Sequence, residues 1–393
     1  MSRLLGRSAL ILCAIVAVIA VVWGPAYARG ASFVIRAAQL EGILLDAATV
    51  GSQPFTIGEA RPLQTRHGVI RSQLYRPDRH IRRVVVVVPG VHAMGIDEPR
   101  LRTFASELAA TGVAALTIEL PDLMRYRLDV RVVDQIVDAV QWVRGQPAIG
   151  PVEKVGLMGI SFAGGLAVVA AGRPDVRDHV AFVFSFGGHG DFPRALRYLC
   201  TGTEPLRPGD PPEVAARMQP PHDYGVAILL LDRAEDLVPE TQVEPLRQGI
   251  LTFLHASQLD VVDKPSSAAV FAAARSAAES LPEPAATLMH YVNTRNVTEL
   301  GARLLPVIEQ GSFPDAMSPE RSPAPRAPVF LLHGIEDTVI PSVETLRLAD
   351  HLEDRTDVRY LLSGLISHAA ADRPPAPGEV LKLVAFWSDL LDE

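Results

Sequence analysis

Five consecutive valines, Val84 to Val88, place the tightest limit on how this chain folds. Valine favours strands because its branched side chain packs well on a pleated surface. A strand with one face in water alternates apolar and polar residues, and this run does not alternate. Unbroken apolar runs are typical of a central strand in a parallel sheet with helices on both faces. Pro89 and Gly90 follow directly and end the strand. We therefore predict an α/β protein built around this segment.

Strand and helix patterns alternate along much of the chain. The segment GVIRSQLYRP at 68–77 alternates apolar and polar residues, as a half-buried strand does. Strands that alternate with helices at this spacing predict βαβ units and a mostly parallel sheet, whose site-building loops lie at the carboxyl ends of the strands. The predicted helices are 101–111, 131–145, 162–172, 342–353 and 379–391, and the other predicted strands are 113–119, 153–159, 179–186, 328–333 and 357–363.

Between residues 187 and 326 this alternation stops. Helical patterns there are separated by proline pairs, and a proline-rich linker precedes residue 328. We interpret the segment as a helical cap inserted into the sheet domain. Upstream of the sheet, a short amphipathic helix is expected over 33–45. The predicted organisation is a signal peptide or signal anchor at 1–28, an N-terminal extension at 29–66, a core made of 67–186 and 327–393, and the cap at 187–326.

The amino terminus has the pattern of an export signal. Arg3 and Arg7 precede an apolar run from Ala9 to Trp23, and Ala26-Tyr27-Ala28 then supplies a small-x-small cleavage pattern. The run is short for a membrane-spanning helix, yet extending it to residue 27 nearly reaches the required length. A retained anchor, with membrane attachment through residues 9–27, therefore stays open beside cleavage. Both place the folded body outside the cytoplasm, and the alternative is a cytoplasmic protein with an apolar N-terminal helix.

Composition narrows the class of partner. Nearly half of the residues are hydrophobic, which indicates a globular chain, and the net charge is -8. No basic face or stripe stands out, so we expect no nucleic-acid partner. The two cysteines, Cys13 and Cys200, lie far apart and predict no disulfide in the folded body. The chain contains no CxxC pair and no HExxH helix, so we predict neither a metal ion nor a cofactor.

The strongest chemical pattern surrounds Ser161. A strand ends in Gly159-Ile160-Ser161-Phe162-Ala163-Gly164-Gly165, and a helix rich in small residues follows at once. A serine hydroxyl is a weak nucleophile, so it needs a tight turn that exposes it to a general base. Strand, turn and helix in this order are the context of a nucleophile elbow. We predict Ser161 as nucleophile, against the alternative of an ordinary serine in a glycine-rich turn.

A second pattern follows the five valines. The loop from Pro89 to Gly95 occupies the place where this arrangement provides a backbone N–H for a developing oxyanion, together with the N–H of the residue after the nucleophile. That assigns the oxyanion hole to Val91 and Phe162. His92 in the same loop either contacts substrate or holds the loop through its ring.

The acid and the base are predicted near the carboxyl end of the chain. The strand Pro328 to Leu332 delivers Asp337 in the sequence H-G-x-x-D-x-x-x-P, and the adjacent Glu336 is expected to point away. His368 lies 31 residues beyond Asp337 (368 − 337) and follows the last predicted strand. An aspartate in this position orients the imidazole of the base and stabilises its protonated form.

Three further residues are candidates for the site. Asp236 follows the apolar run Gly225 to Leu231 and is a rival acid, although its surroundings are helical and no second histidine follows at suitable spacing. His189, in Gly187-Gly188-His189-Gly190-Asp191, either lines the pocket or belongs to a turn held by glycine and capped by Asp191. Cys200 is expected to be a small buried residue rather than a reactive thiol.

Together the four motifs around Ser161, Val91, Asp337 and His368 resemble the α/β-hydrolase superfamily, in the chain order Ser, Asp, His. The G-x-S-x-A-G-G elbow and the strand GVIRSQLYRP are similar to its dienelactone-hydrolase-like and prolyl-oligopeptidase-like branches, over about 67–190 and 327–392. Dienelactone hydrolases have cysteine where this chain has Ser161. The resemblance implies an α/β-hydrolase fold with a mostly parallel sheet, flanking helices and a helical cap insertion.

The predicted function is hydrolysis of a small carboxylic ester through an acyl-enzyme. A serine peptidase or thioesterase of the same fold is the second hypothesis, and a peptidase of this kind usually needs a charged group for a peptide terminus and a propeller or large lid. No N-terminal segment of propeller length precedes the sheet. The third hypothesis is a binding module without activity, and such modules commonly lack the serine or the histidine.

Overall fold

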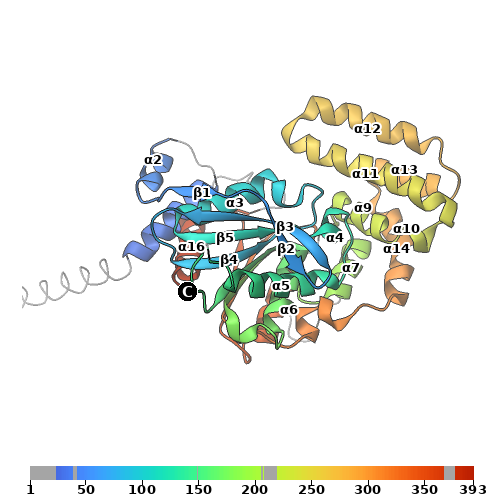
Figure 1. The fold of residues 1–393 in the computed structure, drawn as a ribbon. Helices are drawn as coiled ribbons and strands as arrows, with labels where there is room; N and C mark the ends of the chain where they lie inside the picture. Colours follow the sequence, from blue (N-terminus) through green and yellow to red (C-terminus); the bar gives the residue numbers. More distant parts are fainter. Residues whose placement is uncertain (1–23, 39–41, 148, 205–206, 208–218, 367–376) are drawn as a thin grey trace, which may run out of the picture.

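The computed structural model describes residues 24–38, 42–147, 149–204, 207, 219–366 and 377–393. One sheet organises the body in the order β1-β3-β5-β4-β6-β7-β8-β9, with β2 paired to β3 (Figure 1). The strands are β1 Phe55–Ile57, β2 Arg61–Thr65, β3 Gly68–Pro77, β4 Arg83–Val88, β5 Val113–Ile118, β6 Val155–Ile160, β7 Val180–Phe186, β8 Val329–Gly334 and β9 Val358–Ser363.

From β5 to β9 every neighbouring pair is parallel, while β1, β2 and β5 all pair with β3 in antiparallel fashion. This strand order, with a serine in the turn after β6, is that of the α/β-hydrolase fold, as predicted from the sequence. Parallel strands end at one edge, so the loops after β4, β6, β7 and β8 meet there. That edge carries the candidate site.

The five valines form the predicted central strand. Residues Val85 to Val88 are fully buried, and β4 lies between β5 and β6. Val84, Val86 and Val88 face one apolar core, whereas Val85 and Val87 face the other. Both faces of the strand are therefore covered, which explains why the sequence shows no polar alternation.

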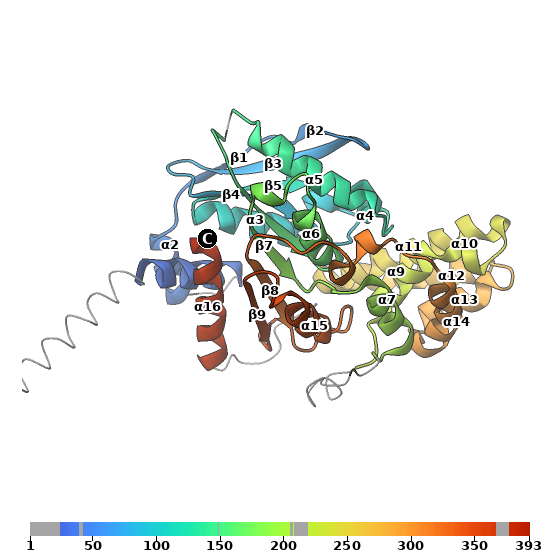
Figure 2. The same ribbon diagram turned by 90° about the horizontal axis from the view of Figure 1, so that it is seen from below.

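Helices cover both faces of the sheet. The body helices are α3 Pro99–Ala110, α4 Pro121–Met124, α5 Arg131–Arg144, α6 Phe162–Gly172, α15 Val343–Leu352 and α16 Pro377–Asp392. The α3 and α16 helices pack on one face, and α5, α6 and α15 pack on the other. Figure 2 shows α15 and α16 on opposite sides of β8 and β9. Each predicted body helix and strand is confirmed, with ends that differ by at most about two residues.

The N-terminal part of the described chain belongs to the body. A helix covers residues 24–37, and α2 covers Ile43–Val50. The single helix predicted over 33–45 is wrong, because Gly42, with φ of 76°, precedes the start of a separate helix at Ile43. Phe33 packs against Trp387 of α16 in a tilted arrangement, with ring centroids 4.3 Å apart. β1 and β2, within the predicted extension, add to the sheet.

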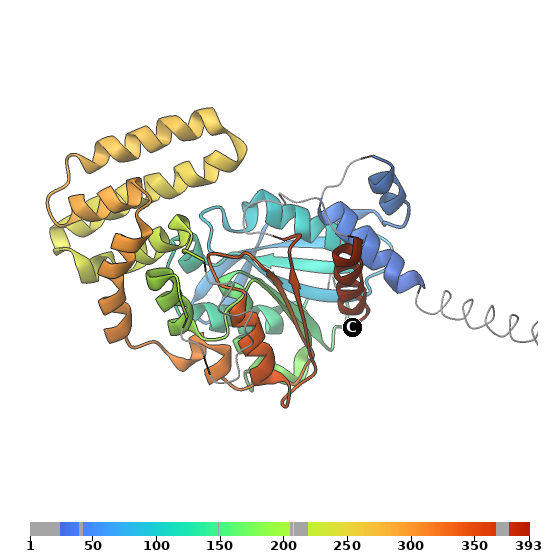
Figure 3. The same cartoon turned by 180° about the vertical axis from the view of Figure 1, so that it is seen from behind.

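The segment after β7 is helical, as predicted. Its helices are α7 Phe192–Thr201, α9 Asp223–Asp232, α10 Ala234–Leu237, α11 Glu240–Val262, α12 Lys264–Ala278, α13 Ala285–Asn293 and α14 Val297–Gln310. Figure 3 shows this insertion at the end of the molecule opposite the N-terminal helix. Two short 3₁₀ turns at Asp315–Met317 and Pro319–Arg321 lead back to β8.

A search of the described helices finds none that is both long and apolar enough to cross a membrane. The apolar run predicted as an export signal, Ala9 to Trp23, lies outside the described residues.

Candidate active site

Ser161 occupies the turn between β6 and α6 in a strained conformation. Its φ is 58° and its ψ is −136°, values that a non-glycine residue rarely adopts and that cost of order 1–3 kcal/mol. Such strain persists only where the surrounding structure enforces it. The Ser161 N–H donates to the carbonyl of Phe186 on β7 at 2.7 Å, and its carbonyl accepts from the Gly164 N–H at 2.7 Å. The side chain is partly exposed at the carboxyl edge of the sheet, as a nucleophile requires.

The elbow depends on small residues. A Cβ on Gly159 would lie 2.2 Å from the carbonyl oxygen of Ala163, so no larger residue fits where strand and helix cross. Ala163 is fully buried at this crossing. Alanine can therefore replace glycine at position 163 without disturbing the turn, because the helix backbone approaches residue 159 and not the side chain of residue 163.

The loop at residues 89–95, which we call the oxyanion loop, lies against the elbow. A Cβ on Gly90 would lie 3.3 Å from both the Ile160 carbonyl oxygen and Ser161 Cβ. Gly90 thus contacts the turn at Ser161 directly, and Val91 is the next residue in the loop. Phe162 is the first residue of α6, and its ring is buried while its N–H lies at the helix N-terminus. These positions agree with the predicted oxyanion donors, whose role stays a prediction.

His92 holds the oxyanion loop through its ring. Its Nδ1 accepts a hydrogen bond from the Met94 N–H at 3.2 Å. That bond leaves the proton of the neutral ring on Nε2. Burial lowers the pKa of His92, against the opposing effect of nearby Glu98, and so favours the neutral form. Of the two predicted roles, the structure supplies a contact for the loop-holding one.

Asp337 lies in the loop after β8 and is almost fully buried. Its Oδ1 accepts from the N–H groups of Val339 at 2.8 Å and Ile340 at 3.1 Å. Two backbone donors on one oxygen fix the orientation of the carboxylate. Glu336 beside it is exposed, as predicted.

His333 lies beside the predicted acid, a contact that the sequence did not suggest. Its fully buried ring lies with Nε2 at 2.8 Å from the Ile340 carbonyl oxygen and 3.4 Å from Asp337 Oδ2, while Nδ1 lies 2.7 Å from Thr345 Oγ1. A carbonyl oxygen can only accept, so Nε2 carries the proton and faces the carboxylate. The sequence H-G-x-x-D could have indicated this contact, because it places His333 four residues before Asp337.

The strand register brings the predicted nucleophile and the predicted acid to the same edge of the sheet. Ile160 of β6 is paired with Phe186 of β7, which is in turn paired with Leu332 of β8. The next residue after Phe186, Gly187, has φ of 61°, and a Cβ on it would lie 3.4 Å from Asp337 Oδ2. The backbone of Gly187 therefore lies between the Ser161 turn and the acid. His368, the predicted base, lies outside the described residues.

His189 is enclosed by protein. Its Nε2 lies 2.8 Å from the Met317 carbonyl oxygen, and its ring contacts those of Phe162 and Phe192 with centroids 5.4 and 5.5 Å away. The side chain has no exposed surface. The structure thus places His189 behind α6 and supports the turn hypothesis, in which Asp191 caps α7 by accepting from the Arg194 N–H at 3.0 Å.

A buried carboxylate fixes this turn. Glu344 of α15 accepts from the N–H groups of Gly190 and Asp191 through Oε2, at 2.7 and 3.0 Å, and pairs with Arg194 at 2.5 Å. Burial would raise the pKa of Glu344, but the charge and hydrogen bonds of Arg194, with hydrogen bonds from Glu204 and the Asp191 backbone, together hold that pKa below its usual range. The carboxylate stays charged, so the loop after β7 is held rigidly beside the site.

The two rival residues occupy other surroundings. Residues Gly225 to Leu231, which resembled an acid-bearing strand, form part of α9 and are buried. Asp236 lies on α10 with a half-exposed side chain, 4.0 Å from Arg233. Cys200 is buried on α7, and burial raises the pKa of its thiol to about 12. It is therefore protonated at neutral pH and is not a thiolate nucleophile.

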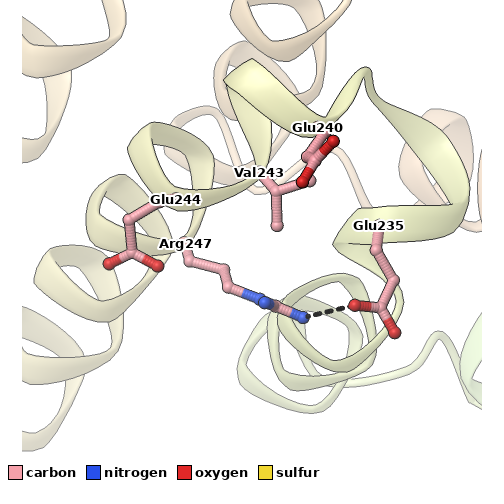
Figure 4. Close-up of a pocket in the computed structure, with 5 residues that line it drawn as sticks. All are labelled: Glu235, Glu240, Val243, Glu244 and Arg247. Carbon is pink, nitrogen blue, oxygen red and sulfur yellow. Dashed lines mark hydrogen bonds and ion pairs between the residues drawn. The ribbon is translucent and has the colours of Figure 1, made fainter.

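Figure 4 shows a recess on the insertion, between α10 and α11. An ion pair between Arg247 and Glu235, 3.5 Å apart, crosses it. The lining residues are Glu235, Glu240, Val243, Glu244 and Arg247, and none of the predicted site residues is among them. Within the described ranges, no group of three or more His, Cys, Asp and Glu side chains is arranged to hold a metal ion.

Comparison with known proteins finds similar solved structures but no matching protein family. No protein-family model matches this chain, and no curated protein sequence matches it. Among solved structures, it is similar to Pyrococcus horikoshii acylaminoacyl peptidase, with a TM-score of 0.47 and 12% identity over 89% of this chain. The chain spans 43% of the length of that peptidase.

Two smaller enzymes are similar over most of their length. An esterase from Pyrobaculum calidifontis gives a TM-score of 0.44 at 16% identity, over 88% of this chain and 89% of the esterase. A dienelactone hydrolase from Anabaena variabilis gives 0.40 at 17% identity, over 85% and 96%. These values concern the fold alone, and the assignment of the fold rests on the strand order and the turn at Ser161.

Proposed function

We propose that this chain is a serine hydrolase that cleaves a small carboxylic ester with Ser161, Asp337 and His368. The observation that carries the proposal is the strained backbone of Ser161 at the carboxyl edge of the sheet, beside the loop that holds the buried Asp337. A protein that used this serine only as a helix cap would gain nothing from that strain. The Ser161 side chain makes no capping hydrogen bond to α6.

In the proposed reaction, His368 accepts the hydroxyl proton while Ser161 Oγ attacks the ester carbonyl carbon. The N–H groups of Phe162 and Val91 bind the resulting oxyanion. The alcohol leaves with the proton from His368, and an acyl-enzyme remains. Water then attacks the acyl carbon and gives a proton to His368. The tetrahedral intermediate collapses as the acid leaves, and His368 returns that proton to Ser161 Oγ. Asp337 orients the imidazole and stabilises its charged form.

Amides and thioesters form the second candidate substrate class. The same residues can transfer an acyl group to water from an ester, an amide or a thioester. The ester is favoured by the apolar character of the insertion. Residues Val226 to Leu231 of α9 and Ile250 of α11 form part of an apolar core in the insertion. We propose that this insertion covers the site, where an apolar surface suits an acyl chain better than a charged peptide.

A substrate panel tests this proposal. Purified protein is assayed against p-nitrophenyl esters from acetate to laurate, matched thioesters and peptide p-nitroanilides, with labelling by a fluorophosphonate in parallel. We expect labelling together with turnover of esters well above that of the anilides. Anilide hydrolysis at equal or greater kcat/KM would move the assignment to a peptidase, and absence of both labelling and turnover would contradict a hydrolase.

We further propose that the body functions outside the cytoplasm, after export directed by residues 1–28 or anchored through residues 9–27. The support is the order Arg3, Arg7, apolar run and Ala-Tyr-Ala in the sequence. The first residue of the mature protein is expected to be Arg29, or the full chain is expected to fractionate with membranes. A chain that kept Met1 and stayed in the soluble cytoplasmic fraction would contradict both versions.

A further inference from the structure

Tyr126 is a second strained residue near the site, and the proposed mechanism gives it no role. It follows α4 with φ of 59°, a left-handed conformation that costs a side-chain-bearing residue roughly 1–2 kcal/mol. Its side chain is only 2% exposed. Tyrosine is a poor choice for such a backbone position, so its side chain must gain contacts that offset the strain.

Those contacts come from the insertion. Gln258 of α11 donates from Nε2 to the Tyr126 hydroxyl at 2.8 Å, and the same nitrogen lies 3.5 Å from the hydroxyl of Tyr224 on α9. The pKa of Tyr126 is raised by burial and by its hydrogen bond to Tyr224. The hydroxyl therefore stays protonated while it accepts from Gln258.

The same hydroxyl reaches the oxyanion loop. The backbone of Ala93, two residues after Val91, lowers the pKa of Tyr126 against the effect of burial, so this hydroxyl lies near the loop. The α4 helix also packs against this loop. A Cβ on Gly95 would lie 2.8 Å from Sδ of Met124, which is two residues before Tyr126. The Tyr126 hydroxyl thus bonds to α11 of the insertion, and the turn that carries Tyr126 packs against the loop that holds a predicted oxyanion donor.

We propose that Tyr126 is a positioning residue that couples the insertion to the oxyanion loop, with Gln258 as its partner across the junction. The inference rests on the proposed function for its effect on catalysis. An N–H donor aimed at an oxyanion acts only as that charge develops, so a loosened loop lowers kcat more than it raises KM. Neither Tyr126 nor Gln258 touches the reacting atoms in this proposal.

A double-mutant cycle tests the coupling. Tyr126→Phe and Gln258→Met each keep the bulk of the side chain and remove the bond between them, and Tyr75→Phe is the control. Tyr75 is equally buried, and its hydroxyl donates to Gln73 on β3, outside the site. We expect about a tenfold lower kcat for each single variant with KM within twofold, no further loss in the double variant, and parental kinetics for Tyr75→Phe.

Losses that multiply in the double variant, or a Tyr126→Phe enzyme with parental kcat, would overturn the coupling. Amide hydrogen exchange gives a measurement that does not need turnover. Peptides covering residues 89–98 and 250–260 are expected to exchange faster in both single variants than in Tyr75→Phe. If the parent lacked esterase activity, the proposed function would fail, while unchanged exchange in Tyr126→Phe would separately reject the junction.

Discussion

The carboxyl edge of the sheet and the helical insertion position their side chains in different ways. At the sheet edge, Ser161 and Asp337 follow strands whose register is fixed through Ile160, Phe186 and Leu332. The insertion packs mostly on itself, as in the edge-to-face contact of Phe253 with Phe271. Among its polar contacts with the site loops, the His222 N–H donates to the Thr338 carbonyl at 2.8 Å. The difference suggests that the sheet edge supplies the chemistry and the insertion tunes it.

The largest effect is expected at the sheet edge itself. Ser161→Ala removes the attacking oxygen and should lower turnover by roughly 10⁵-fold or more and abolish fluorophosphonate labelling. The matched control is Ser280→Ala, an exposed serine at the end of α12, which should label like the parent. Circular dichroism and thermal unfolding check that both variants fold. Undiminished labelling of Ser161→Ala would place the nucleophile elsewhere.

The next comparison sets the acid of the sheet edge against its rival in the insertion. In Asp337→Asn the amide oxygen can keep the two bonds from Val339 and Ile340, while its NH₂ replaces the oxygen that faces His333. The orienting acceptor of the base is lost, and the rate should fall by about 10³- to 10⁴-fold. Asp236→Asn, on the half-exposed side of α10, should stay within twofold in kcat/KM. The reverse pattern would move the acid into the insertion.

The same division explains what could be predicted from the sequence. The strand of five valines and the G-x-S-x-A-G-G turn are short-range patterns, so their elements and Ser161 were predicted nearly residue by residue. Asp337 followed from its position after an apolar strand. His333 was missed because its hydrogen-bond partners, Ile340 in the loop after β8 and Thr345 on α15, are brought to its ring by a loop whose folding the pattern does not specify.

Tyr126 was missed for a stronger reason. Its significance lies in the contact with Gln258, 132 residues away, and no periodicity links two residues across an insertion. The placement of His189 was likewise open, since a glycine-rich turn looks the same whether it is enclosed or lines a pocket. Only the packing of Phe162 and Phe192 around its ring decides that it is buried.

The smallest effect is expected for the insertion, and it tests whether these helices select the substrate. Leu251 lies two turns before Gln258 on α11 and therefore on the same face, the face that meets the body at Tyr126. It is only partly buried, unlike Leu288 of α13, which is packed inside the insertion. Leu251→Ala should favour longer acyl chains, with the laurate-to-acetate ratio of kcat/KM rising about three- to tenfold.

Leu288→Ala is the control for this last comparison. It deletes the same atoms from a closed core, so it should lower the free energy of unfolding by about 2–5 kcal/mol and leave the chain-length profile unchanged. Ester profiles and denaturant unfolding curves of both variants separate the two effects. If Leu251→Ala lost stability with a parental profile, the insertion would serve to enlarge the core, and the choice of acyl chain would have to come from the loops of the sheet edge.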